Sequence, residues 1–153
     1  MKTRAAIELD KLGVPYELKE FEPQEIGTQE VVEMLGVPHE QVVKTLVTNG
    51  DATGVMLALV PGPKSLDLKA LARASGNKRC AMVAKVDVEK LTGYVCGGCT
   101  ALGAKKKFPV FMDSGCMGLP YISVSAGKRG AQIFVKPEDW ARVTGAEIAD
   151  IAK

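Results

Sequence analysis

A lysine lies inside an apolar, strand-like run, where an ammonium group is unexpected. Lys44 belongs to the sequence Val-Val-Lys-Thr-Leu-Val of residues 42–47, and the geometry of a strand places its side chain on one face with Val42 and Leu46. Burial would lower the pKa of the ammonium group, which is one way in which a lysine becomes available for binding or catalysis. The pattern also fits a lysine that extends its charge into solvent, or an edge-strand charge that opposes aggregation. The residue types alone leave these alternatives open.

Residues 92–103 form a glycine-rich segment, with four glycines in twelve positions. Because glycine tolerates positive φ, such a backbone can present N–H groups to a bound oxyanion or carbonyl. The segment lacks a G-x-G-x-x-G fingerprint, and a plain turn between strands accounts for it equally well.

Cys96 and Cys99 form a CxxC pair inside this segment. Such a pair could be half of a zinc site or a redox pair of thiols. A structural zinc needs two more ligands, and the candidates Cys80, Cys116 and His39 show no second CxxC spacing. The flanking sequence also lacks the clear βαβ pattern of a thioredoxin-like protein. We therefore expect four free thiols, no metal and no other cofactor.

Side-chain acid–base catalysis finds little support in the sequence. His39 is the only histidine, and it follows Pro38 at the expected start of a helix, a position that favours a surface role. No Ser-His-Asp triad and no carboxylate pair stands out from the other charged residues.

Two basic clusters adjoin turns and could neutralise the phosphates of a nucleic acid. Solvated surface charge explains each cluster equally simply, unless both border the same cleft. Ser125 precedes the second cluster and could line a pocket there. The clustered residues are Lys105, Lys106, Lys107, Lys128 and Arg129.

The composition limits the kind of protein that can hold these residues. A chain of 153 residues with 46% hydrophobic and 25% charged residues predicts one compact domain over residues 1–153. A net charge of +2 means that a nucleic-acid contact must come from a local patch, and no DNA partner is expected. No signal peptide or apolar run of about 20 residues is present, so we expect a cytoplasmic protein without a membrane partner.

The elements that must position these residues alternate between helices and short strands. Asn49-Gly50 between two strands predicts an antiparallel hairpin, and the class is α+β with a mixed, curled sheet. Apolar spacing and turn residues predict helices over residues 3–12, 28–36, 65–76 and 87–91 and one that begins at Pro137. The expected strands are residues 16–21, 42–48, 55–60, 110–113, 121–124 and 132–135.

Taken together, these segments resemble the YbaK branch of the YbaK/ProX family, relatives of the editing domain inserted in some prolyl-tRNA synthetases. The likeness covers nearly the whole chain. It is carried by Val-Lys-Thr-Leu at residues 43–46, Thr-Gly-Tyr at 92–94 with Gly97-Gly98, Lys-Lys-Lys-Phe-Pro at 105–109, and Ser-Ala-Gly-Lys-Arg-Gly at 125–130.

The resemblance implies a curled, barrel-like sheet flanked by helices, and hydrolysis of the ester that joins an amino acid to the terminal ribose of tRNA. It marks Lys44 as the catalytic lysine. The implied tRNA contacts are the five residues of the two basic clusters. The implied substrate-binding positions are Phe21, Thr45, Gly97, Gly98 and Ser125, with the amides of the two glycines near the ester carbonyl.

The implied substrate is a mischarged aminoacyl-tRNA, with Cys-tRNA(Pro) as first choice, and prolyl-tRNA synthetase is an implied partner. For cysteine-clearing members, the resemblance implies that the substrate thiol attacks its own ester, which fits a chain without an evident triad. A non-catalytic module that binds tRNA or a synthetase is the alternative. Three positions depart from the common family pattern: Phe21 replaces a tyrosine, Ala101 a proline and Gln132 an aspartate.

Overall fold

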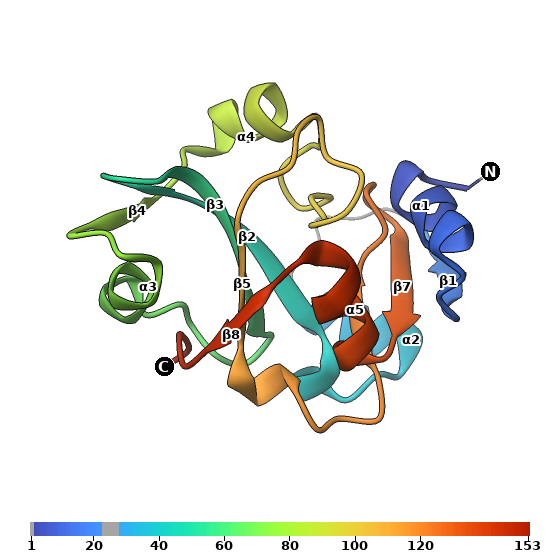
Figure 1. The fold of residues 1–153 in the computed structure, drawn as a ribbon. Coiled ribbons are helices and arrows are strands. Elements are labelled where there is room, and N and C mark those ends of the chain that lie inside the picture. The colour runs from blue at the N-terminus through green and yellow to red at the C-terminus, as the bar shows by residue number, and fades with distance from the viewer. Residues whose placement is uncertain (1, 23–27) are drawn as a thin grey trace.

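The strands of the protein form two sheets in a computed structural model that describes residues 2–22 and 28–153 (Figure 1). The α+β class is confirmed, whereas a barrel-like closure is not. The three-stranded sheet is antiparallel, in the order β1 (Glu17–Glu20), β7 (Ala131–Val135), β6 (Ile122–Ser125). The five-stranded sheet is mixed, in the order β4 (Cys80–Met82), β2 (Val43–Gly50), β3 (Gly54–Pro61), β5 (Val110–Asp113), β8 (Glu147–Ala149).

Five α-helices accompany these strands in the described part of the chain, at or near the predicted positions. They are α1 (Arg4–Leu12), α2 (Thr28–Leu35), α3 (Leu68–Ser75), α4 (Lys85–Thr92) and α5 (Pro137–Thr144), with short 3-10 helices at His39–Gln41 and Ser114–Cys116. None of the helices in residues 2–22 and 28–153 has the length and apolar character that crossing a membrane requires.

The predicted hairpin of β2 and β3 is confirmed as an antiparallel pair. Asn77 stabilises its turn: Asn77 Oδ1 accepts hydrogen bonds from the N–H groups of Ala52 at 2.7 Å and Thr53 at 3.0 Å. A Cβ atom at Gly50 would lie 2.3 Å from the Asn77 amide nitrogen, so a larger residue there would displace the Asn77 side chain. The hairpin thereby sets the register that places Lys44 opposite Val60.

Successive side chains of β3 point to opposite faces of the five-stranded sheet, and each face packs against an apolar cluster. Leu57 and Leu59 enter the main core, which also holds Trp140 of α5. Met56, Ala58 and Val60 enter a second cluster, on the side of α3. Every residue from Met56 to Val60 is at most 1% exposed, which explains why the sequence reads there as a nearly continuous apolar run.

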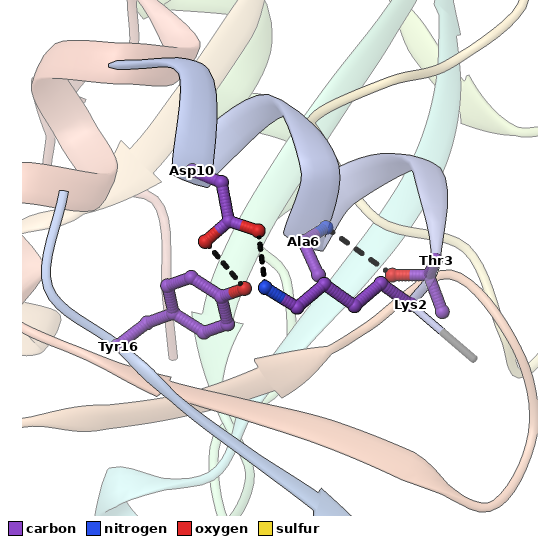
Figure 2. A network of polar contacts seen from close by, with 5 residues as sticks. All are labelled: Lys2, Thr3, Ala6, Asp10 and Tyr16. Carbon is purple, nitrogen blue, oxygen red and sulfur yellow. Dashed lines mark hydrogen bonds and ion pairs between the residues drawn. The ribbon is translucent and has the colours of Figure 1, made fainter. Parts of the chain in front are cut away.

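Helix α1 begins with a side-chain cap and carries a small polar network on its outer side (Figure 2). Thr3 Oγ1 accepts a hydrogen bond from the Ala6 N–H at 3.2 Å, which satisfies one of the free donors of the first turn. Asp10, about one turn after Ala6, accepts hydrogen bonds from Lys2 Nζ at 2.5 Å and from the Tyr16 hydroxyl at 2.9 Å. These contacts join Lys2, α1 and the residue just before β1 at the surface.

The two sheets come together where β2 begins. An isolated parallel bridge joins Val42, just before β2, to Ser123 of β6. This bridge brings the strand that carries Lys44 beside the strand that ends at Ser125.

Candidate active site

A cavity of about 260 Å³ lies at this junction of the two sheets. Four of the predicted site residues line it together, namely Lys44, Thr45, Gly97 and Ser125. The same wall includes seven residues that the sequence did not assign to a substrate site: Val31, Val42, Val43, Leu46, Cys96, Cys99 and Gln132.

Lys44 reaches the cavity from β2 and is half-buried. This partial removal from water lowers the pKa of its ammonium group. Nζ donates a hydrogen bond to the carbonyl of Lys64, in the turn that follows β3. An ammonium group has three N–H donors, so two remain besides the one that the Lys64 carbonyl accepts.

Gly97 is the glycine of the 92–103 segment that lines the cavity, and its φ of 89° suits a residue without a Cβ atom. The N–H of the neighbouring Gly98 donates to the carbonyl of Val95 at 2.9 Å. A Cβ atom at Gly98 would lie 3.1 Å from the backbone nitrogen of Arg129, so this glycine allows two loops to pack closely. Arg129 Nη2 also donates to the carbonyl of Cys96 at 3.0 Å. Of the two glycines, Gly97 is therefore the better placed to offer its amide to a substrate.

Ser125 and Gln132 lie opposite each other in the register of β6 and β7, and each is 9% exposed. Ser125 Oγ accepts a hydrogen bond from the Gly127 N–H at 3.3 Å. Gln132 Oε1 accepts one from the Ser123 hydroxyl at 2.8 Å. Together they form a polar patch of the wall, and the sequence pointed to Gln132 only as a departure from the family pattern.

Thr45 lines the cavity and carries a buried hydroxyl. Its Oγ1 is buried and has no hydrogen-bond partner among the residues that the structure describes. A buried polar atom without a partner is unfavourable. A bound molecule that hydrogen-bonds to Oγ1 would remove this penalty.

Phe21 lies behind the cavity wall rather than in it. Its side chain packs against the small cluster that contains Val31 and Val42, which line the cavity. Its backbone N–H donates to the carbonyl of Gly130 at 2.8 Å. Phe21 therefore supports two residues of the wall from outside.

Comparison with known proteins identifies the family of this chain. The aminoacyl-tRNA editing domain profile matches residues 22–143. EbsC of Enterococcus faecalis, whose name proposes a Cys-tRNA(Pro)/Cys-tRNA(Cys) deacylase, is 42% identical over 152 residues, which cover 98% of this chain and 93% of EbsC. The chain belongs to the aminoacyl-tRNA editing domain family.

Two further similar proteins have prolyl-tRNA synthetase or proline–tRNA ligase in their names. The crystal structure of a proposed trans-editing enzyme for prolyl-tRNA synthetase has a TM-score of 0.89 at 27% identity, with 98% of this chain and 95% of the other covered. A proline–tRNA ligase of Fervidobacterium nodosum is 32% identical over 87 residues, which are 57% of this chain and 15% of the ligase.

The editing-domain cavity contains the CxxC pair in its wall. Burial raises the pKa of the Cys99 thiol to about 11, whereas Cys96 is partly exposed. Cys80 and Cys116 lie in other parts of the fold, beside α3 and after β5. Across residues 2–22 and 28–153, no three His, Cys, Asp or Glu side chains are grouped so that they could hold a metal ion.

The two basic clusters of the editing domain border different hollows. Lys106 and Lys107 line a cavity with Leu57 of β3, and Lys106 Nζ lies 5.3 Å from the centre of the Phe108 ring. Lys128 lines a separate cavity next to the glycine-rich segment. These three lysines therefore line two different cavities, and contact of either cluster with tRNA stays a prediction.

Proposed function

We propose that this protein is a trans-editing aminoacyl-tRNA deacylase that hydrolyses the ester of a mischarged tRNA, with Cys-tRNA(Pro) as its main substrate. The observation that supports this most is the meeting of Lys44, Thr45 and Gly97 around one cavity. The apolar side chains of Val42 and Leu46 complete the wall. A volume of about 260 Å³ is just below the range of about 300–1,000 Å³ that is usual for drug-sized ligands, so it suits a small aminoacyl group.

The proposed reaction uses the thiol of the cysteinyl group as nucleophile. Its sulfur attacks the ester carbonyl carbon, the bond from that carbon to the ribose oxygen breaks, and the thiol proton passes to the ribose oxygen. The products are the free tRNA hydroxyl and a cyclic thioester, which water hydrolyses to cysteine. Intramolecular attack needs correct positioning more than a strong base.

The protein's part in this reaction is to bind the ester and stabilise the developing oxyanion. The Lys44 ammonium group and the Gly97 N–H are the donors assigned to the carbonyl oxygen, because both line the cavity. The Thr45 hydroxyl is assigned to a polar group of the aminoacyl moiety. Cys99 is not assigned as nucleophile, because a thiol with a pKa of about 11 stays protonated at neutral pH.

A matched series of cysteinyl-, seryl- and alanyl-tRNA(Pro) tests the substrate. We expect the cysteinyl ester to be cleared fastest, since serine and alanine lack the thiol and depend on attack by water. A difference of one small group in a pocket changes the ratio of the rates for two substrates by only about 10–200-fold. Side-chain size is therefore a weak basis for discrimination among these three esters. Equal rates for all three esters would overturn the thiol mechanism but keep the deacylase. Binding of tRNA without hydrolysis of any ester would establish the alternative, a non-catalytic module.

Replacing Lys44 tests the site. Lys44→Ala should lower the deacylation rate about 100-fold or more, as for loss of other oxyanion donors, with an unchanged circular-dichroism spectrum and melting temperature. Lys44→Arg should restore little activity, because a planar guanidinium replaces a compact ammonium. The matched control is Lys69→Ala, at an exposed position of α3, which should keep wild-type activity. A Lys44→Ala rate within twofold of wild type would overturn the assignment.

A further inference from the structure

A second cavity, of about 370 Å³, lies beside the proposed active site and is lined by three cationic side chains. Arg4 is the first residue of α1, Lys2 precedes the helix by two residues, and Lys128 comes from the turn between β6 and β7. We call it the basic cavity. Neither Lys2 nor Arg4 belongs to the basic clusters that the sequence singled out.

The basic cavity shares two loops with the proposed active site. In the first loop, Val95 lines the basic cavity and Gly97, two residues later, lines the active-site cavity. In the second loop, Gly127 lines the basic cavity and Ser125, two residues earlier, lines the active-site cavity. A chain spans at most about 3.6 Å per residue, so the two walls are within about 7 Å of each other.

Arg4 is fixed in position at the edge of the basic cavity. Its guanidinium lies 4.7 Å from the centre of the Tyr94 ring, and its Nη2 donates to the carbonyl of Gly93 at 3.3 Å. The Tyr94 side chain is itself buried and donates to the carbonyl of Leu102 at 2.8 Å. A guanidinium has five N–H donors, so Arg4 keeps several for an anion.

The other two cations pair with carboxylates that do not line the cavity. Lys2 Nζ lies 2.5 Å from Asp10 (Figure 2), and Lys128 Nζ lies 3.8 Å from Glu20. All four side chains are substantially exposed, and exposed ion pairs of this kind are weak. An anion in the cavity can therefore compete with both carboxylates.

We propose that the basic cavity binds a phosphate of the RNA strand that carries the scissile ester. This inference rests on the proposed function. The ester is attached to the terminal ribose, and the nearest phosphate is joined to the other end of that same ribose. A basic cavity next to the ester site is therefore where that phosphate would lie. With a net charge of only +2, the protein needs such a local patch to hold a polyanion.

The first test uses an acceptor-stem RNA hairpin that carries no amino acid. Its binding is measured by fluorescence anisotropy at several salt concentrations. The triple variant Lys2→Gln, Arg4→Gln, Lys128→Gln should bind at least tenfold more weakly. Its slope of log affinity against log salt should fall by about 0.7–0.9, the effect of one phosphate contact. The control Lys69→Gln, Lys78→Gln alters exposed cations that do not line the basic cavity and should change binding less than threefold. Wild-type affinity and slope in the triple variant, or an equal loss in the control, would overturn the proposal.

The second test removes the competing carboxylates and predicts a change of opposite sign. Asp10→Asn and Glu20→Gln should each tighten hairpin binding, because Lys2 and Lys128 lose their partners. The charge-matched control Glu147→Gln changes an exposed carboxylate on β8 and should tighten binding less. If all three substitutions had the same effect, only the overall charge would matter and the basic cavity would not be a site.

A kinetic test separates this inference from the proposed function. On mischarged tRNA, the triple variant should raise KM with little change in kcat. On cysteinyl adenosine, an ester without a phosphate, its kcat/KM should equal that of wild type. An equal loss on both substrates would overturn the phosphate site. If the wild-type protein hydrolysed neither ester but the hairpin results held, the deacylase proposal would fail and the phosphate site would stand.

Discussion

At the scale of single residues, the four thiols of the protein differ in their chemistry because they differ in burial. Burial raises the pKa of Cys99 to about 11 and that of Cys116 to about 12. Below these values the thiols are mostly protonated, so at pH 8 about one Cys99 in a thousand is a thiolate. Cys80 and Cys96 are partly exposed.

We therefore expect iodoacetamide at pH 8 to label Cys80 and Cys96 of the folded protein and to spare Cys99 and Cys116. Labelling of Cys99 should increase as the pH rises toward 11, since the thiolate fraction then grows about tenfold per pH unit. Peptide mass spectrometry after timed alkylation measures this. Denatured protein, in which all four should react, is the control, and equal native rates at the four sites would contradict the prediction.

The same assignment predicts the effect of removing both thiols from the active-site wall. Replacing Cys96 and Cys99 by serine should leave most of the deacylation activity, because the proposed work of this segment is done by the Gly97 amide. The rate on cysteinyl-tRNA measures it, after a melting curve has shown that the variant is folded. A tenfold loss, or about 1.4 kcal/mol of transition-state stabilisation, would assign a role to the thiols.

At the scale of elements, the edge strand β8 is held in place by a side chain. Asp113 at the end of β5 is buried and accepts hydrogen bonds from the N–H groups of Gly115, Ile151 and Ala152, each at 2.9 Å. The last two belong to the segment that directly follows β8. This carboxylate therefore joins the C-terminal segment to β5, the strand next to the sheet edge.

Asp113→Ala should lower the free energy of unfolding by about 3 kcal/mol or more, because it leaves three backbone donors without their acceptor. Urea denaturation followed by circular dichroism measures the change. Ser114→Ala is the matched control. The neighbouring hydroxyl is exposed and donates to the exposed Asp150, so its loss should cost about 0.5 kcal/mol or less. Equal effects of the two substitutions would show that Asp113 does not anchor the segment.

The elements that the sequence predicted are those with a repeated local pattern. The hairpin of β2 and β3 followed from alternation and an Asn-Gly turn, and the helices followed from apolar spacing and glycine stops. Strands β4 and β8 have only three residues each and mostly exposed side chains, so no period could mark them. The division of the strands into two sheets depends on long-range pairing, which a local pattern does not contain.

The same reasoning explains which site residues could be found. Lys44 was visible because a charge interrupts an apolar strand, and Gly97 because glycines gather in one segment. That Ser125 faces Gln132 follows from the register of β6 and β7, which no single segment reveals. Lys2 and Arg4 reach their cavity only through the packing of α1 beside two distant loops, and their sequence neighbourhood looks like an ordinary helix start.

At the scale of the whole molecule, burial is concentrated at the centre of the five-stranded sheet. Strand β3 has neighbouring strands on both sides and apolar clusters on both faces. Strand β1 lies at the edge of the smaller sheet and has no fully buried residue. Local opening is easiest where few apolar contacts must break.

We therefore expect the amides of β3 to exchange with deuterium only through global unfolding, and those of β1 to exchange through smaller openings. Hydrogen exchange followed by NMR or mass spectrometry gives both opening free energies. Addition of urea supplies the control, because exchange by global unfolding depends strongly on urea and exchange by local opening depends weakly. Equal protection and equal urea dependence in the two strands would contradict this distribution of stability.

Removal of the Thr45 hydroxyl should have opposite effects on the stability of the fold and on the deacylation rate. Valine has nearly the same shape without the hydroxyl, so Thr45→Val should raise the free energy of unfolding by about 1 kcal/mol, which is about 2–4 °C in Tm. The same change should slow deacylation about tenfold, because the aminoacyl group loses a partner. Calorimetry and initial rates on one protein preparation test both effects, and a variant that melts lower than wild type would show that the hydroxyl is satisfied in the folded protein. If both effects are found, the most stable sequence at this position is not the most active one, and engineering for heat resistance would select against the enzyme's own chemistry.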